Sequence, residues 1–254
     1  MTSDSTAHSE RTIAIFVDFE NLALGAEQGL RTRFQLDLVL KRLLERGRIV
    51  FKRAYCDWSR FQTFTREFHL HGFELIDIPH SLVSGKNSAD IRMVVDALDL
   101  CHSKAHIDTF ALLTGDSDFS PLVAKLKEND KHVVGCGVRS STSDLLAQNC
   151  DEFIIYDELI KASKRARKGG TTEHSGRQRE VFERLTETVA SLESEYDPLW
   201  GSLVKKTLKR VYPDFVESAY GYQNFSALLK DAQREGLIKL EEGEGGNFKI
   251  SSAT

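Results

Sequence analysis

The chain has 254 residues, of which 41% are hydrophobic and 28% are charged, and its formal net charge at pH 7 is -4. This composition is that of a folded globular protein with room for one large domain or two smaller ones. No apolar run approaches the ~18 residues of a membrane-spanning helix and residues 1–10 lack the features of a secretory signal, so we expect a cytoplasmic protein without a membrane partner.

Residues 12–78 alternate between strand and helix patterns. A β-rich run at 12–17 ends at Asp18 and reads as a central strand that delivers an acid to its carboxyl end. The segments that follow are a helix at 34–46, a strand at 49–56, a helix at 60–71 and a strand at 73–78. This order predicts a parallel sheet with right-handed crossovers.

A further helix is predicted to open at Lys86-Asn87-Ser88-Ala89-Asp90. Its expected apolar stripe consists of Ile91, Val94, Val95 and Leu98. Asn87 or Ser88 would cap this helix, which places Asp90 in its first turn. The helix dipole favours an acid there, so the position of Asp90 alone is explained by structure.

The segment Thr114-Gly115-Asp116-Ser117-Asp118-Phe119-Ser120-Pro121-Leu122 follows a buried strand at 108–113. Ser120 is a suitable N-cap and Pro121 a suitable first helical residue, which would leave Asp116 and Asp118 in an open turn. Ligands of open parallel sheets bind at this end of the strand. The remaining elements of this half are a helix at 121–129, a strand at 132–136, a short helix at 143–148 and a short strand at 153–156.

Acids from three separate segments are therefore expected at one edge of the sheet: Asp18, Asp90, and the pair Asp116 and Asp118. Carboxylates that converge without a counter-charge repel one another, and a hard divalent cation relieves that repulsion. Mg²⁺ or Mn²⁺ prefers carboxylate and water ligands, and such an ion activates water and stabilises charge on a phosphoryl group. The combination points to phosphodiester chemistry.

At three places the sequence resembles the motifs of NYN domains, the PIN-like nuclease group that includes LabA-like bacterial proteins. These are IFVDFEN at 15–21, KNSAD at 86–90 and LTGDSDFSPL at 113–122. The resemblance covers about residues 11–160 and implies a PIN-like α/β/α sandwich that cleaves RNA with a metal. It carries Asp18, Asp90, Asp116 and Asp118 over as the metal site, and Asn21 as a polar group that orients the acid or contacts substrate.

Further substrate contacts are expected beside these acids. Ser117 has a hydroxyl suited to a phosphate or to a metal-bound water, although it equally suits a turn. Lys86 and Arg139 fall in predicted loops near the site and are candidates to meet phosphate.

Basic charge is concentrated at the junction between the two halves of the chain. Residues 161–180 hold 7 Lys and Arg against 2 acids, whereas the chain as a whole is acidic. Such a segment attracts a polyanion or is simply a solvated linker. We expect a basic linker at 161–177.

The four cysteines have no close pairing and are interpreted as reduced, structural thiols.

A second domain is predicted at 178–251. Helical stripes occur around 181–192, 203–211 and 224–235, and the runs 237–240 and 248–250 flank a Gly-rich turn as a hairpin. Three helices and a hairpin make a winged helix-turn-helix. The segments WGSLVK at 200–205, VYPDF at 211–215 and YGYQNFSALL at 220–229 resemble the LOTUS or OST-HTH domain.

That resemblance implies RNA binding, or binding of a partner protein. Stacking of Tyr222 on a base and phosphate contacts from Lys205, Lys206 and Arg210 are the expected interactions. A surface patch and core aromatic residues are the alternative interpretation of the same residues.

The sequence thus predicts a metal-dependent ribonuclease in which the second domain recruits or positions RNA. The alternative is a noncatalytic RNA-binding or scaffold protein whose acids form a structural cation site. A phosphatase or a TOPRIM-type nuclease is a weaker third reading, because the residues after Asp18 lack an Asp-x-Asp pattern and Glu20 is a poor candidate for the TOPRIM glutamate. The sequence leaves formation of a homo-oligomer open.

Overall fold

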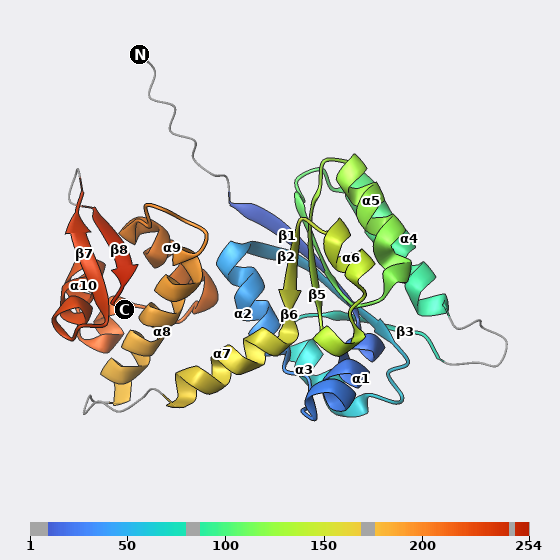
Figure 1. The fold of residues 1–254 in the computed structure, drawn as a ribbon, viewed down its shortest axis with the longest axis horizontal. Coiled ribbons are helices and arrows are strands. Elements are labelled where there is room, and N and C mark those ends of the chain that lie inside the picture. The colour runs from blue at the N-terminus through green and yellow to red at the C-terminus, as the bar shows by residue number, and fades with distance from the viewer. Residues whose placement is uncertain (1–9, 80–86, 169–175, 244–246, 254) are drawn as a thin grey trace, which may run out of the picture. The chain divides into compact units, whose positions relative to one another are not determined.

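The computed structural model describes residues 10–79, 87–168, 176–243 and 247–253. These residues form two compact units, divided between Ser163 and Lys164. The first is an α/β unit and the second contains helices with a small sheet (Figure 1). Within the described residues, no helix is long and apolar enough to cross a membrane.

The first unit is built on a six-stranded sheet in the order β3-β2-β1-β4-β5-β6, and every neighbouring pair of strands is parallel. Its strands are β1 (Arg11–Asp18), β2 (Gly47–Cys56), β3 (Glu74–Asp77), β4 (Thr109–Leu113), β5 (His132–Gly137) and β6 (Glu152–Ile155). This confirms the predicted α/β class and the parallel sheet.

Helices cover both faces of the sheet. They are α1 (Phe19–Leu30), α2 (Leu36–Arg46), α3 (Gln62–Leu70), α4 (Ser88–Ser103), α5 (Ser120–Glu128), α6 (Asp144–Asn149) and α7 (Tyr156–Lys168). Alternate residues of β1 serve the two cores: Ile13, Ile15 and Val17 pack with α1, α2, α3 and α7, whereas Ala14 and Phe16 pack with α4, α5 and α6. The helix α1 was not predicted from the sequence.

The strand order places a topological switch point between β1 and β4. After β1 the chain enters α1 on one face, and after β4 it enters α5 on the other. The carboxyl ends of these two strands therefore border a crevice; Asp18 is the last residue of β1, and Thr114 directly follows β4.

The apolar stripe predicted for α4 is wrong in part. Ile91 and Val95 are 63% and 56% exposed. The buried stripe consists instead of Met93, Ala97, Leu100 and Cys101. Both stripes have helical spacing, so periodicity alone does not choose between them.

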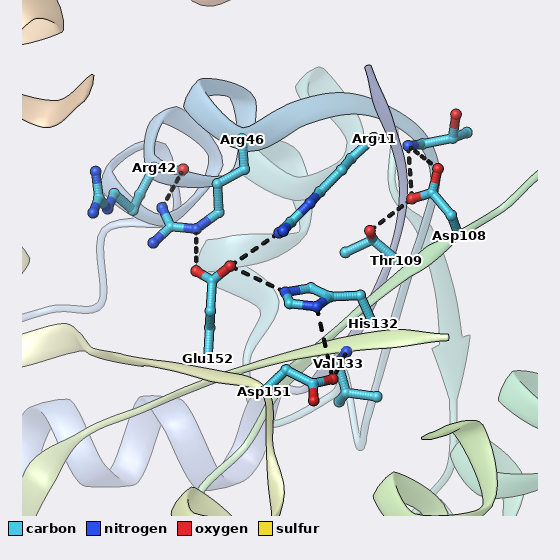
Figure 2. Close-up of polar contacts among 10 residues, drawn as sticks. Arg11, Arg42, Arg46, Asp108, Thr109, His132, Val133, Asp151 and Glu152 are labelled. Atoms are coloured by element: carbon cyan, nitrogen blue, oxygen red, sulfur yellow. Dashed lines mark hydrogen bonds and ion pairs between the residues drawn. The ribbon is translucent and has the colours of Figure 1, made fainter. Parts of the chain in front are cut away.

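The opposite, amino-terminal edge of the sheet is held by a polar network around Glu152 (Figure 2). Its carboxylate accepts hydrogen bonds from Arg11 at 2.9 Å and Arg46 at 2.7 Å, and lies 3.0 Å from a ring nitrogen of His132. The contact with His132, followed by those with the two arginines, holds the pKa of Glu152 well below its usual range. This network ties β1, α2, β5 and β6 together far along β1 from Asp18.

Among its described residues, the second unit contains three complete α-helices and an antiparallel pair of strands, in agreement with the predicted three helices and hairpin. They are α8 (Gly176–Glu193), α9 (Gly201–Val211), α10 (Phe225–Arg234), β7 (Ile238–Glu242) and β8 (Phe248–Ser252). Apolar residues from all five elements form one core. The four cysteines all lie in the first unit, where they are buried and free.

Candidate active site

Asp18 lies at the junction of β1 and α1 and is fixed by two hydrogen bonds. As the N-cap of α1 it accepts a bond on Oδ1 from the backbone amide of Asn21 at 3.4 Å. Its Oδ2 accepts a second bond from the hydroxyl of Thr114 at 2.9 Å. The carboxylate is thus oriented by the end of β4 as well as by its own helix.

Asn21 links the same two segments from the other side. Its side-chain oxygen accepts a hydrogen bond from the backbone amide of Gly115 at 2.9 Å. The hydroxyl of Thr114 also accepts a bond from the amide of Asp116 at 3.2 Å. Asn21 therefore holds the loop that carries Asp116.

The turn after β4 differs from the prediction. Residues Ser117–Phe119 form a short 3-10 helix, η1, whose N-cap is Asp116, and α5 begins directly afterwards at Ser120. Ser120 is therefore not an N-cap, since Phe119 occupies that position. Oδ1 of Asp116 accepts a hydrogen bond from the amide of Asp118 at 2.9 Å.

A pocket of about 250 Å³ opens at this edge of the sheet. Its described lining includes Asp18, Asn21, Asp90 and Asp116, so four of the predicted site residues share one cavity. The remaining lining residues are Glu20, Leu24, Tyr55, Cys56, Asp57, Ile78, Pro79, Ser88 and Ala89. Asp118 is exposed on η1 and Ser117 is half-buried beside it; neither is part of this lining.

Two further acids line the pocket: Asp57 was missed by the sequence analysis, and Glu20 was considered there only as the glutamate of a TOPRIM-type site. Asp57 directly follows β2, which pairs with β1 so that Asp18 lies opposite Tyr55. The signal was available, because Asp57 follows a strand in the same way as Asp18 closes one. Its Oδ1 accepts bonds from the amide and hydroxyl of Ser59 at 3.1 and 2.5 Å.

The electrostatics of the pocket are those of crowded carboxylates. Burial, opposed by the Thr114 hydrogen bond and aided by the charge of Asp90, raises the pKa of Asp18 to about 7. The pKa of Asp90 is also raised, first by burial and then by the charges of Asp116 and Asp118. No Lys or Arg occurs among the described lining residues to offset this repulsion.

The donor set fits a hard divalent cation. Among the described residues no three His, Cys, Asp or Glu side chains converge as a complete metal cluster. Mg²⁺, however, keeps several waters and is held through one or two carboxylates together with substrate phosphates. Asp18 and Asp116, with Asp90 across the same pocket, offer that kind of open site.

Gly115 is packed too tightly for any side chain. A Cβ at this position would overlap the backbone carbonyl of Ser141 and lie 2.8 Å from the Cα of Thr142.

We therefore expect Gly115→Ala to displace the loop that carries Asp116 and to break the hydrogen bond from the Gly115 amide to Asn21. If RNA is cleaved as the sequence predicts, the expected result is a loss of that cleavage of about tenfold or more, since small errors in positioning are costly. Rates of RNA cleavage, measured beside thermal unfolding, check this; wild-type rates in the variant would contradict a role of the loop in placing Asp116.

In the second unit, the residues predicted to contact RNA interact with other residues of the protein. Lys205 forms an ion pair with Glu217 at 2.7 Å, and the hydroxyl of Tyr222 donates to Asp231 at 2.6 Å. Arg210 donates to the hydroxyl of Thr207 at 3.4 Å, and Lys206 lies on the same helix, α9. In the first unit, Arg139 pairs with Glu158, and Lys86 lies outside the described residues.

Comparison with known proteins identifies a family, and the similar proteins include the two described below. The profile of the NYN domain family matches residues 12–157. An uncharacterised protein of Methanocaldococcus jannaschii is 32% identical to this chain over 148 residues. The aligned residues are 58% of this chain and 55% of that protein, so the chain spans about half the length of this relative. The crystal structure of a Vibrio parahaemolyticus protein of unknown function is similar with a TM-score of 0.53 and 26% identity, covering 63% of this chain and 98% of that one.

Proposed function

Because the chain belongs to the NYN domain family through residues 12–157, we propose that its acidic pocket is the active site of a metal-dependent ribonuclease. The family is one of nuclease-like domains with RNA-related functions. The single observation that carries the proposal is that Asp18, Asp90 and Asp116, from three separate elements, line one pocket whose buried carboxylate has a pKa raised to about 7.

In this proposal Asp18 and Asp116 hold Mg²⁺ or Mn²⁺, while Asp90 and Asp118 act as ligands directly or through water. The ion, when bound, supplies charge stabilisation at the phosphate and lowers the pKa of an attacking water. Thr114 keeps the carboxylate of Asp18 in place through its 2.9 Å hydrogen bond. Asn21 keeps the Asp116 loop in place, and the hydroxyl of Ser117 is a candidate to contact the substrate.

The second unit is proposed to recruit RNA or a partner protein, in line with its resemblance to the LOTUS domain. In this division, residues 11–160 form the nuclease domain, 161–177 the basic linker and 178–251 the recruiting domain. Lys206, Arg210 and Lys205 on α9 are its proposed phosphate contacts. Tyr222 is proposed to offer the face of its ring, because its hydroxyl is held by Asp231.

The test is a cleavage assay on single-stranded and structured RNA and on the matching DNA, each with Mg²⁺, Mn²⁺ or EDTA. We expect RNA to be cut with a divalent ion and to stay intact in EDTA. The test also addresses a second candidate, a noncatalytic RNA-binding protein in which the acids of the pocket form a structural cation site. RNA that is bound but never cut with either ion would support that candidate and overturn the nuclease.

A further inference from the structure

The acidic pocket poses a problem for an RNA substrate, because its described lining holds five acids and no Lys or Arg. These acids are Asp18, Glu20, Asp57, Asp90 and Asp116. A divalent cation offsets part of their charge, but a polyanion that approaches the pocket still needs cations of the protein on its phosphates. A cation at the rim of the pocket would fulfil that need.

Arg60 is such a cation. Its guanidinium Nη1 lies 2.6 Å from Oε1 of Glu20, one of the lining acids. Arg60 follows β2 in the turn that contains Asp57, and its backbone amide donates to the carbonyl of Asp57 at 3.1 Å. The side chain therefore extends from the same edge of the sheet as the pocket.

The guanidinium of Arg60 is also held in position. Its carbon lies 5.7 Å from the centre of the Phe61 ring, so the group interacts with an aromatic ring as well as with the carboxylate of Glu20. The side chain is nevertheless 45% exposed. A guanidinium presents five donors in a planar fork that matches phosphate, and a fork that is already oriented loses little entropy on binding.

We propose that Arg60 binds a phosphate of the RNA at the rim of the acidic pocket, with Glu20 orienting its guanidinium. This assignment rests on the proposed function and adds a residue that contacts the substrate. Arg60 would thus be part of the RNA-binding surface, and the carboxylates would perform the chemistry.

The chain offers a matched control in Arg33. It pairs with Glu67 at 3.3 Å, lies 4.1 Å from the centre of the Phe64 ring and is 54% exposed. Neither Arg33 nor Glu67 lines the pocket. Like Arg60, Arg33 therefore has a glutamate and an aromatic ring beside its guanidinium, but it is not paired with a residue of the pocket.

The test is equilibrium binding of a labelled single-stranded RNA to the full chain across a series of salt concentrations at constant Mg²⁺. All proteins carry Asp116→Asn, so that cleavage is slow compared with the binding measurement. We expect Arg60→Gln to weaken binding about threefold to tenfold and to reduce the slope of log affinity against log salt by about 0.7, the value for one phosphate contact on a single strand. Arg33→Gln should change neither quantity, and Arg60→Lys should keep the slope.

An unchanged slope and affinity in Arg60→Gln, or equal losses in Arg60→Gln and Arg33→Gln, would overturn the assignment. Absence of RNA binding by the protein with Arg60 intact would overturn it as well. A failure of the proposed function has a different signature, because the wild type would then leave RNA uncut while the binding results for Arg60 still stand. Thermal unfolding of each variant verifies that the fold is retained.

Discussion

Asp116→Asn is expected to lower the rate of RNA cleavage on the order of a hundredfold to a thousandfold, the size of effect seen when one charge-stabilising group is removed from an active site. The substitution keeps the shape of the side chain and the oxygen that accepts a hydrogen bond from the backbone amide of Asp118. It removes the negative charge that a divalent cation requires. The fold should persist, because Asp116 is a half-buried residue of a loop and not of a core.

Asp99→Asn is the matched control for this loss. Asp99 is an exposed aspartate on α4, the helix that carries Asp90, and it does not line the pocket. Asp99→Asn changes the net charge by the same amount as Asp116→Asn, so any general effect of charge on RNA binding appears in both variants. Full activity in Asp116→Asn, or an equal loss in Asp99→Asn, would show that the carboxylate of Asp116 is not part of the reaction.

Asp18→Asn is expected to abolish cleavage and yet to stabilise the protein at about pH 8 in EDTA. The pKa of Asp18 is raised from 3.8 to about 7 in the folded protein. The folded state therefore binds this proton more tightly than the unfolded state does, and the resulting stability is present at low pH and is lost as the pH rises through about 7. An uncharged Asn avoids that loss, which amounts to about 4 kcal/mol for a shift of this size.

The measurement is thermal unfolding of both proteins at about pH 5 and about pH 8. The difference in Tm between variant and wild type should increase towards the higher pH, because only the wild type must ionise a buried carboxyl group. Mn²⁺ should raise the Tm of the wild type at the higher pH and should have less effect on the variant. The same Tm difference at both pH values would contradict the account of Asp18.

The strands and most helices were predictable because their patterns are strong and local. The strand β1 contains the apolar run 13–17 and ends in an acid, and the parallel sheet follows from the alternation of strands and helices. From the parallel sheet it follows that Asp18 and Asp116 lie at one edge. The helix α1 escaped prediction because its glycines, Gly25 and Gly29, interrupt the helical pattern; in the structure they allow close packing against Ser141 and Ser140.

The parts that the sequence misplaced depend on tertiary packing. Ser120 and Pro121 have the pattern of a helix start, but the buried side chain of Phe119 and the capping carboxylate of Asp116 extend the turn into η1. The hydroxyl of Ser120 is buried without a hydrogen-bond partner among the described residues, which is the cost of that arrangement. Which apolar stripe of α4 faces the sheet depends likewise on contacts with β1 and β2, which no local pattern contains.

The central claim is that the acidic pocket holds a divalent cation for the reaction. The most direct measurement is anomalous diffraction from crystals of the protein grown with Mn²⁺. The account predicts an anomalous peak in the pocket, about 2.2 Å from a carboxylate oxygen of Asp18 or Asp116. A fully occupied structure with Mn²⁺ bound elsewhere, and none at these two carboxylates, would contradict it.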